Sequence, residues 1–68
     1  MSKVTAENLT DEQIREARES DPEIISSQIA CDALGLPRGP YEYELQPGDV
    51  GRARRWVAAA INARAKES

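Results

Sequence analysis

The last third of the chain, residues 49–66, carries the pattern that most constrains the fold. At about 100° per residue, its apolar side chains gather on one arc of a helix. These side chains are Val50, Ala53, Trp56, Val57, Ala60 and Ile61. The opposite arc, centred on Ala59, carries Arg52, Arg55, Asn62 and Lys66. The pattern predicts one amphipathic helix over 49–66, which packs through the first arc and presents the second arc to a partner.

A first, shorter helix is expected over residues 10–20. Thr10 and Gln13 have the spacing of a capping box, and Leu9 and Ile14 have the spacing of a hydrophobic staple. The apolar face of this helix is thin, so it is expected to cover a core rather than to form one. Residues 1–8 show no periodicity and are expected to form a flexible N-terminus.

A second helix is expected over residues 22–34. Asp21 suits the N-cap and Pro22 suits the first turn, while Ser20 with Glu23 offers an alternative capping box. The apolar residues lie on two sides, which is typical of a helix packed between neighbours. One side carries Ile25, Ile29 and Ala33, and the other carries Ile24, Cys31 and Leu34.

The connector between the second and third helices is long and rich in glycine and proline. Gly35 is expected to end the second helix in a left-handed conformation, and Pro37 forbids its continuation. Tyr41, Tyr43 and Leu45 alternate with glutamates, which predicts an extended segment lying over the helices. The predicted fold is therefore all-α: one domain over residues 9–68, a small three-helix bundle with a long ordered connector between helices two and three.

Composition excludes most kinds of catalytic site. The 68 residues include no His and a single cysteine, Cys31, so neither an intramolecular disulfide nor a structural zinc site is expected. No glycine-rich phosphate loop and no nucleophile elbow occurs. Glu42 and Glu44 lack the pattern of a calcium loop. We expect no enzyme activity, no metal and no cofactor.

The sequence also carries no sign of a membrane or export segment. The longest apolar run, residues 57–61, is far shorter than the roughly 20 residues of a membrane span. The N-terminus lacks the hydrophobic core of a signal peptide. Together with a free cysteine, these features predict a cytoplasmic protein with no membrane partner.

The charge is distributed unevenly along the chain. Residues 1–44 hold ten acidic and four basic side chains, and residues 45–68 hold two acidic and five basic ones. A basic last helix is compatible with nucleic-acid binding, which we keep as the alternative function. Against it, the whole chain has a net charge of −3. Arg54 and Arg64 also flank the apolar arc, where their heads are expected to pair with acidic residues of the first two helices.

Binding to another protein is the favoured function. Trp56 lies one helical turn after Arg52, and with Tyr41 and Tyr43 it supplies residue types that are enriched at interface hot spots. The alternative is that Trp56 is the main core residue. The expected partner-binding residues are Arg52, Arg55, Trp56 and Lys66 with Tyr41 and Tyr43. The expected role is that of a small regulator, inhibitor or assembly factor, and self-association is left open.

Three stretches of the chain together resemble a known kind of protein. They are residues 9–15 (LTDEQIR), 31–35 (CDALG) and 60–65 (AINARA). In this order they are similar to short uncharacterised bacterial proteins that resemble accessory genes of phages and other mobile elements. The resemblance implies a small intracellular protein that acts on a host or viral component. It implies no activity and no site residues.

Overall fold

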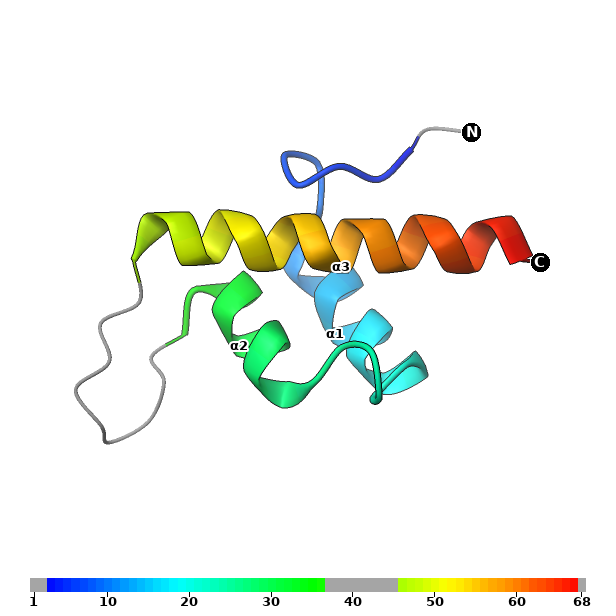
Figure 1. Cartoon of the computed structure of the whole chain (residues 1–68), viewed down its shortest axis with the longest axis horizontal. Helices are drawn as coiled ribbons and strands as arrows, with labels where there is room; N and C mark the ends of the chain where they lie inside the picture. The colour runs from blue at the N-terminus through cyan, green and yellow to red at the C-terminus, as the bar shows by residue number, and fades with distance from the viewer. Residues whose placement is uncertain (1–2, 37–45, 68) are drawn as a thin grey trace.

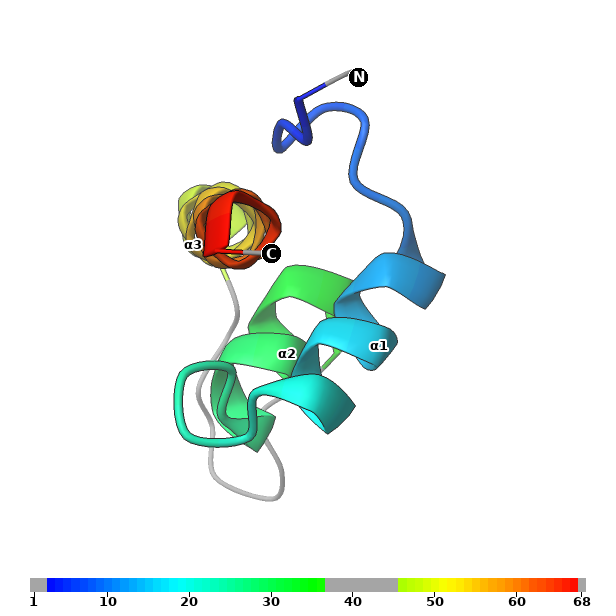
Figure 2. The ribbon, with the colours of Figure 1, turned by 90° about the vertical axis from the view of Figure 1, so that its right-hand side faces the viewer.

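The computed structural model describes residues 3–36 and 46–67. These residues form three helices and no strand: α1 (Asp11–Ser20), α2 (Ser27–Leu34) and α3 (Pro47–Glu67). α1 and α2 lie side by side against one side of α3, the longest helix (Figures 1 and 2). The all-helical prediction with three helices is confirmed for this part of the chain. The connector with Tyr41 and Tyr43 lies outside the described residues.

The start of α1 follows the local sequence signal. The hydroxyl Oγ1 of Thr10 accepts a hydrogen bond from the backbone N–H of Gln13 at 3.2 Å, and Gln13 Oε1 accepts one from the N–H of Thr10 at 2.8 Å. Leu9 and Ile14, on either side of this capping box, are both buried in the core. The predicted capping box is therefore present, because it needs only residues that are neighbours in the chain.

The start of α2 differs from the sequence prediction. The N–H groups of Ile24 and Ile25 both donate to the carbonyl of Asp21, at 3.1 and 2.7 Å, and close a single turn. The helix itself begins at Ser27 instead of Pro22, after Ser26 has accepted a hydrogen bond from the N–H of Ile29 at 3.3 Å. Breaking the chain direction here buries Ile25 completely. Burial of an isoleucine outweighs the one extra helical turn that Pro22 favours.

The end of α2 was predicted correctly. Gly35 has φ 74°, in the left-handed region that favours glycine. Its N–H donates to the backbone carbonyl of Asp32 at 3.1 Å, and the N–H of Leu36 donates to the backbone carbonyl of Cys31 at 2.9 Å. These two bonds are those of a Schellman motif.

α3 begins two residues before the predicted boundary and ends one residue after it. The N–H of Gln46, the residue before α3, donates to Asp49 Oδ2 at 3.2 Å, as it does to the third helical residue of a capping box. With 21 residues and a rise of about 1.5 Å per residue, α3 is about 31 Å long and sets the longest dimension of the molecule. Within the described part of the chain, no helix combines the length and apolar content needed to cross a bilayer.

The core forms where α3 meets α2 and the turn before it. Ile14, Ile25 and Val57 are its largest fully buried side chains. Small residues fill the rest of the contact between α2 and α3, and these are Ala30, Ala33 and Ala53. Of the predicted apolar arc, Val57 and Ala53 are buried, and Val50, Ala60 and Ile61 are partly buried.

Trp56 departs from the predicted arc, because it is 55% exposed and does not form part of the core. It lies about 100° around the helix from Val57, at the margin of the arc. The buried contact between α2 and α3 is made by alanines instead, and Val57 takes the central position on α3. The interpretation of Trp56 as the main core residue is therefore wrong.

Residues 3–9 lie against α3 on a different side from α2 (Figure 2). We call this segment the N-terminal strap. Residues 1–8 were expected to be flexible, whereas Val4 exchanges two hydrogen bonds with the side chain of Asn62. Asn62 was placed on the outward arc of α3, and this placement is corrected, because the strap covers its side chain in part.

Candidate functional site

The outward side of α3 carries a continuous row of exposed side chains, which we call the α3 stripe. At about 100° per residue, its members fall within roughly a third of the circumference of the helix. All of them are exposed: Arg52, Arg55, Trp56, Ala59, Ala63 and Lys66. The structure thus brings together four of the residues predicted to bind a partner. The other two, Tyr41 and Tyr43, lie outside the described residues.

The centre of the α3 stripe is apolar. Trp56 and Ile24, which are 55% and 50% exposed, line one hollow between α3 and the turn before α2. Ala59 and Ala63 extend this wall along α3, and the hollow has a volume of about 500 Å³. We call it the Trp56 hollow. Two large apolar side chains that share one exposed hollow are the arrangement found at the centre of a protein interface.

The edges of the α3 stripe are basic. Arg52 and Trp56 line a smaller hollow of about 180 Å³ beside α2. Arg55 lies toward the N-terminal strap, and Lys66 lies about 15 Å further along the helix axis than Trp56. None of these three cations forms an ion pair with a carboxylate of the described residues. All three side chains are exposed.

The other two arginines of α3 point toward the rest of the molecule. Arg64 Nη1 lies 2.5 Å from Asp21 Oδ2, and Arg54 Nη1 lies 4.0 Å from Asp11 Oδ1. Their inward pairing was predicted from their positions at the flanks of the apolar arc. The helical period therefore decides which cations of α3 pair with α1 and the residue after it, and which lie on the exposed α3 stripe.

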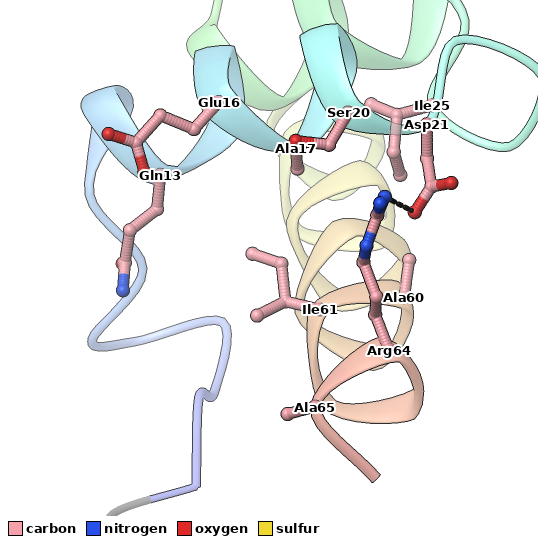
Figure 3. Close-up of a pocket in the computed structure, with 10 residues that line it drawn as sticks. All are labelled: Gln13, Glu16, Ala17, Ser20, Asp21, Ile25, Ala60, Ile61, Arg64 and Ala65. Atoms are coloured by element: carbon pink, nitrogen blue, oxygen red, sulfur yellow. Dashed lines mark ion pairs between the residues drawn. The ribbon is translucent and has the colours of Figure 1, made fainter. Parts of the chain in front are cut away.

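A second hollow, of about 580 Å³, opens between α1 and the C-terminal half of α3 (Figure 3). Its apolar floor includes Ala17, Ile25 and Ile61. Asp21 and Arg64 line both this hollow and the Trp56 hollow, so their ion pair lies between the two. The pair joins the residue that follows α1 to α3, three residues before Ile24.

The described residues of these surfaces offer apolar contacts, positive charge and hydrogen-bond donors. Among residues 3–36 and 46–67, no three acidic or cysteine side chains are grouped so that they could hold a metal ion. Cys31 is a free, partly buried thiol on α2.

Sequence reasoning missed two residues that shape the site. Ile24 was assigned to a helix face, and its place beside Trp56 follows from the turn at Asp21, which local signals do not distinguish from a helix start. Asp32 is buried beneath the small hollow that Arg52 and Trp56 line. Its burial follows from the packing of α2 on α3 and has no signal in the sequence.

No family model, no curated protein and no solved structure matches this chain. The resemblance to short proteins of phages and mobile elements stays a prediction.

Proposed function

We propose that this protein is a small, non-enzymatic binding module, a regulator, inhibitor or assembly factor that docks onto another protein through the α3 stripe. The observation that carries the proposal is the pairing of Ile24 and Trp56, both about half exposed, in one hollow. A chain of 68 residues has little apolar surface to spare from its own core. Leaving its only tryptophan outside that core supports a role in binding.

The chemistry of the α3 stripe favours an amphipathic helix with acidic flanks as the partner segment. Ala59 and Ala63 are one turn apart, and their small side chains let the backbone of a second helix approach closely. Trp56 and Ile24 then contact the apolar face of that helix. Arg52, Arg55 and Lys66 lie at the edges, where carboxylates of the partner complement their charge.

Charge reversal at the edge of the α3 stripe tests the proposal. We expect the double variant Arg52→Glu, Arg55→Glu to lose capture of the partner from extracts of the native host, because both edge cations then repel its acidic flanks. Helicity by circular dichroism is expected to stay at the wild-type level, since both side chains are exposed. Trp56→Ser is expected to lose capture in the same way.

Arg15→Glu is the matched control, because it reverses an exposed arginine on α1, away from the stripe. It is expected to capture the partner as the wild type does. If Arg15→Glu weakens capture as the double variant does, net charge rather than this surface controls binding. A loss of helicity in the double variant would instead make Arg52 and Arg55 structural residues.

Nucleic-acid binding is the alternative, and the three exposed cations of the α3 stripe, Arg52, Arg55 and Lys66, favour it. It predicts a complex at low salt that weakens steeply as salt increases, because binding releases counterions. An electrophoretic shift assay at low salt that shows no complex removes this alternative. Native mass spectrometry of the purified protein tests the non-enzymatic part, which a tightly bound metal or cofactor would contradict.

A further inference from the structure

The N-terminal strap is held on α3 as a peptide ligand is held in a binding site. Asn62 Nδ2 donates to the carbonyl of Val4 at 2.8 Å, and the N–H of Val4 donates to Asn62 Oδ1 at 3.0 Å. One side-chain amide thus satisfies the backbone donor and the backbone acceptor of a single residue, as the backbone of a neighbouring β-strand does. Both bonds are partly buried.

The guanidinium of Arg54 makes the remaining polar contacts of this site. Its Nε donates to the carbonyl of Ala6 at 3.2 Å, and its Nη2 donates to the carbonyl of Leu9. All four hydrogen bonds that tie the strap to α3 therefore go to main-chain atoms of the strap. Val4 is partly buried and packs against the core, and it is the apolar side chain through which the outer end of the strap docks.

The strap is also organised within itself. The N–H of Thr5 donates to Asn8 Oδ1 at 2.8 Å, and the N–H of Asn8 donates to Thr5 Oγ1 at 3.3 Å. Asn8 Nδ2 donates further to the carbonyl of Lys3 at 3.2 Å. Because the segment is ordered by its own side chains, little conformational entropy is lost when it docks as a unit.

We propose that this face of α3, built from Asn62 and Arg54, is a second binding site, and that it exchanges its own strap for the strap of a second copy of this chain. An identical segment reproduces every hydrogen bond and every apolar contact of the intramolecular one, so exchange needs no new chemistry. Opening at the link between Asn8 and the buried Leu9 breaks the three hydrogen bonds of Val4 and Ala6 with α3, which an exchanged strap restores. It also breaks one hydrogen bond next to the link, from the N–H of Leu9 to the carbonyl of Thr5.

The concentration dependence of the exchange follows from the short link. A ligand tethered by a short link has an effective concentration of about a millimolar or more. The wild type is therefore monomeric in dilute solution, and exchanged dimers form only as its concentration approaches that value. When the intramolecular contact is disabled in each of two chains, a chain's own strap no longer competes with the strap of the second chain. The exchanged pair then forms at lower concentration.

The test uses two full-length variants that disable opposite halves of the contact. Val4→Asp places a charge where a partly buried valine docks, which disables the strap but leaves the site on α3 intact. Asn62→Leu keeps the branched shape of the side chain but removes the amide, which disables the site but leaves the strap intact. Each variant alone is expected to be monomeric. Their equimolar mixture is expected to form a heterodimer, detected by native mass spectrometry and sedimentation velocity.

The double variant Val4→Asp, Asn62→Leu is the control, because it lacks a working strap and a working site. At the same total concentration, this double variant is expected to form no dimer. Circular dichroism checks that each chain is folded, and the milder pair Val4→Ser and Asn62→Ala replaces the first pair if helicity falls. Trp56→Ser in both chains is expected to leave the heterodimer intact, which separates this site from the α3 stripe.

Two outcomes would overturn the proposal. The first is a mixture that stays monomeric while both chains keep wild-type helicity. The second is a mixture that stays monomeric although a synthetic peptide of residues 1–9 binds the Val4→Asp chain. In that case the site accepts a free extended peptide and not a second copy of the chain.

Discussion

At the scale of single residues, the side chain of Arg54 connects α3 to two other segments of the chain. Its side chain is only 22% exposed, and its guanidinium donates to carbonyls of two separate segments. One of these carbonyls belongs to Ala33, at 3.1 Å, in the last turn of α2, where backbone oxygens lack helical partners. A cation is favoured at that end of a helix by the helix dipole. Arg54 therefore ties α3 to α2 and to the N-terminal strap at once.

Replacing Arg54 tests this role. We expect Arg54→Leu to lower the free energy of unfolding by about 2–4 kcal/mol, because several charge-assisted hydrogen bonds are lost and the carbonyls stay partly buried. Arg54→Lys keeps the charge but not the planar fork of donors, so it should recover only part of that loss. The measurement is urea denaturation followed by circular dichroism.

The neighbouring Arg55 provides the control for Arg54. It is exposed, so Arg55→Leu is expected to change the free energy of unfolding by no more than about 0.5 kcal/mol. Equal losses in the two leucine variants would mean that the hydrogen bonds of Arg54 contribute nothing specific to stability.

At the scale of the elements, each helix starts with a different side-chain cap. Thr10 and Gln13 cap α1 reciprocally, Ser26 caps α2, and Asp49 bonds the N–H of Gln46 before α3. The sequence predicted the first cap, because the capping box is a strong local signal. It misplaced the second, because Asp21 followed by Pro22 is an equally good local signal for a helix start. Only the burial of Ile25 decides between the two.

The contribution of the Ser26 cap to stability can be measured. We expect Ser26→Ala to lower the free energy of unfolding by about 1 kcal/mol, because the N–H of Ile29 loses its partner. Gln28→Ala, at an exposed position in the same helix, serves as the reference and should be nearly neutral. Thermal unfolding of the two variants gives the comparison. A neutral Ser26→Ala would show that α2 does not depend on this cap.

At the scale of the whole molecule, three segments that are distant in the sequence supply one small core. Ile14 comes from α1, Ile25 from the turn before α2, and Val57 from the middle of α3. α1 and α2 cover one side of α3, and the N-terminal strap covers another (Figure 2). A third side of α3 carries the exposed residues of the α3 stripe. Within residues 3–36 and 46–67, the proposed binding surface is thus the part of α3 that α1, α2 and the N-terminal strap leave exposed.

Two adjacent isoleucines test this division between core and surface. Ile25→Ala is expected to lower the free energy of unfolding by about 2–5 kcal/mol, because it removes a fully buried side chain from the core. Ile24→Ala is expected to cost no more than about 0.5 kcal/mol and to weaken capture of the partner, because Ile24 is half exposed beside Trp56. Chemical denaturation and the capture assay measure the two effects. The reverse order of stability losses would contradict the assignment of the core.

The sequence by itself determined the features that depend on neighbours in the chain. The capping box of α1, the glycine that ends α2, the continuous helix of α3 and the inward turn of Arg54 and Arg64 all follow from local signals and helical period. The tertiary structure alone decided the exposure of residues at the margins of the apolar and polar arcs of α3. Trp56 is exposed and Asn62 is partly covered because alanines of α2 and α3 set how closely the helices pack, and because the strap returns across α3. Such spacing depends on residues in two or three elements together, which no single stretch of sequence encodes.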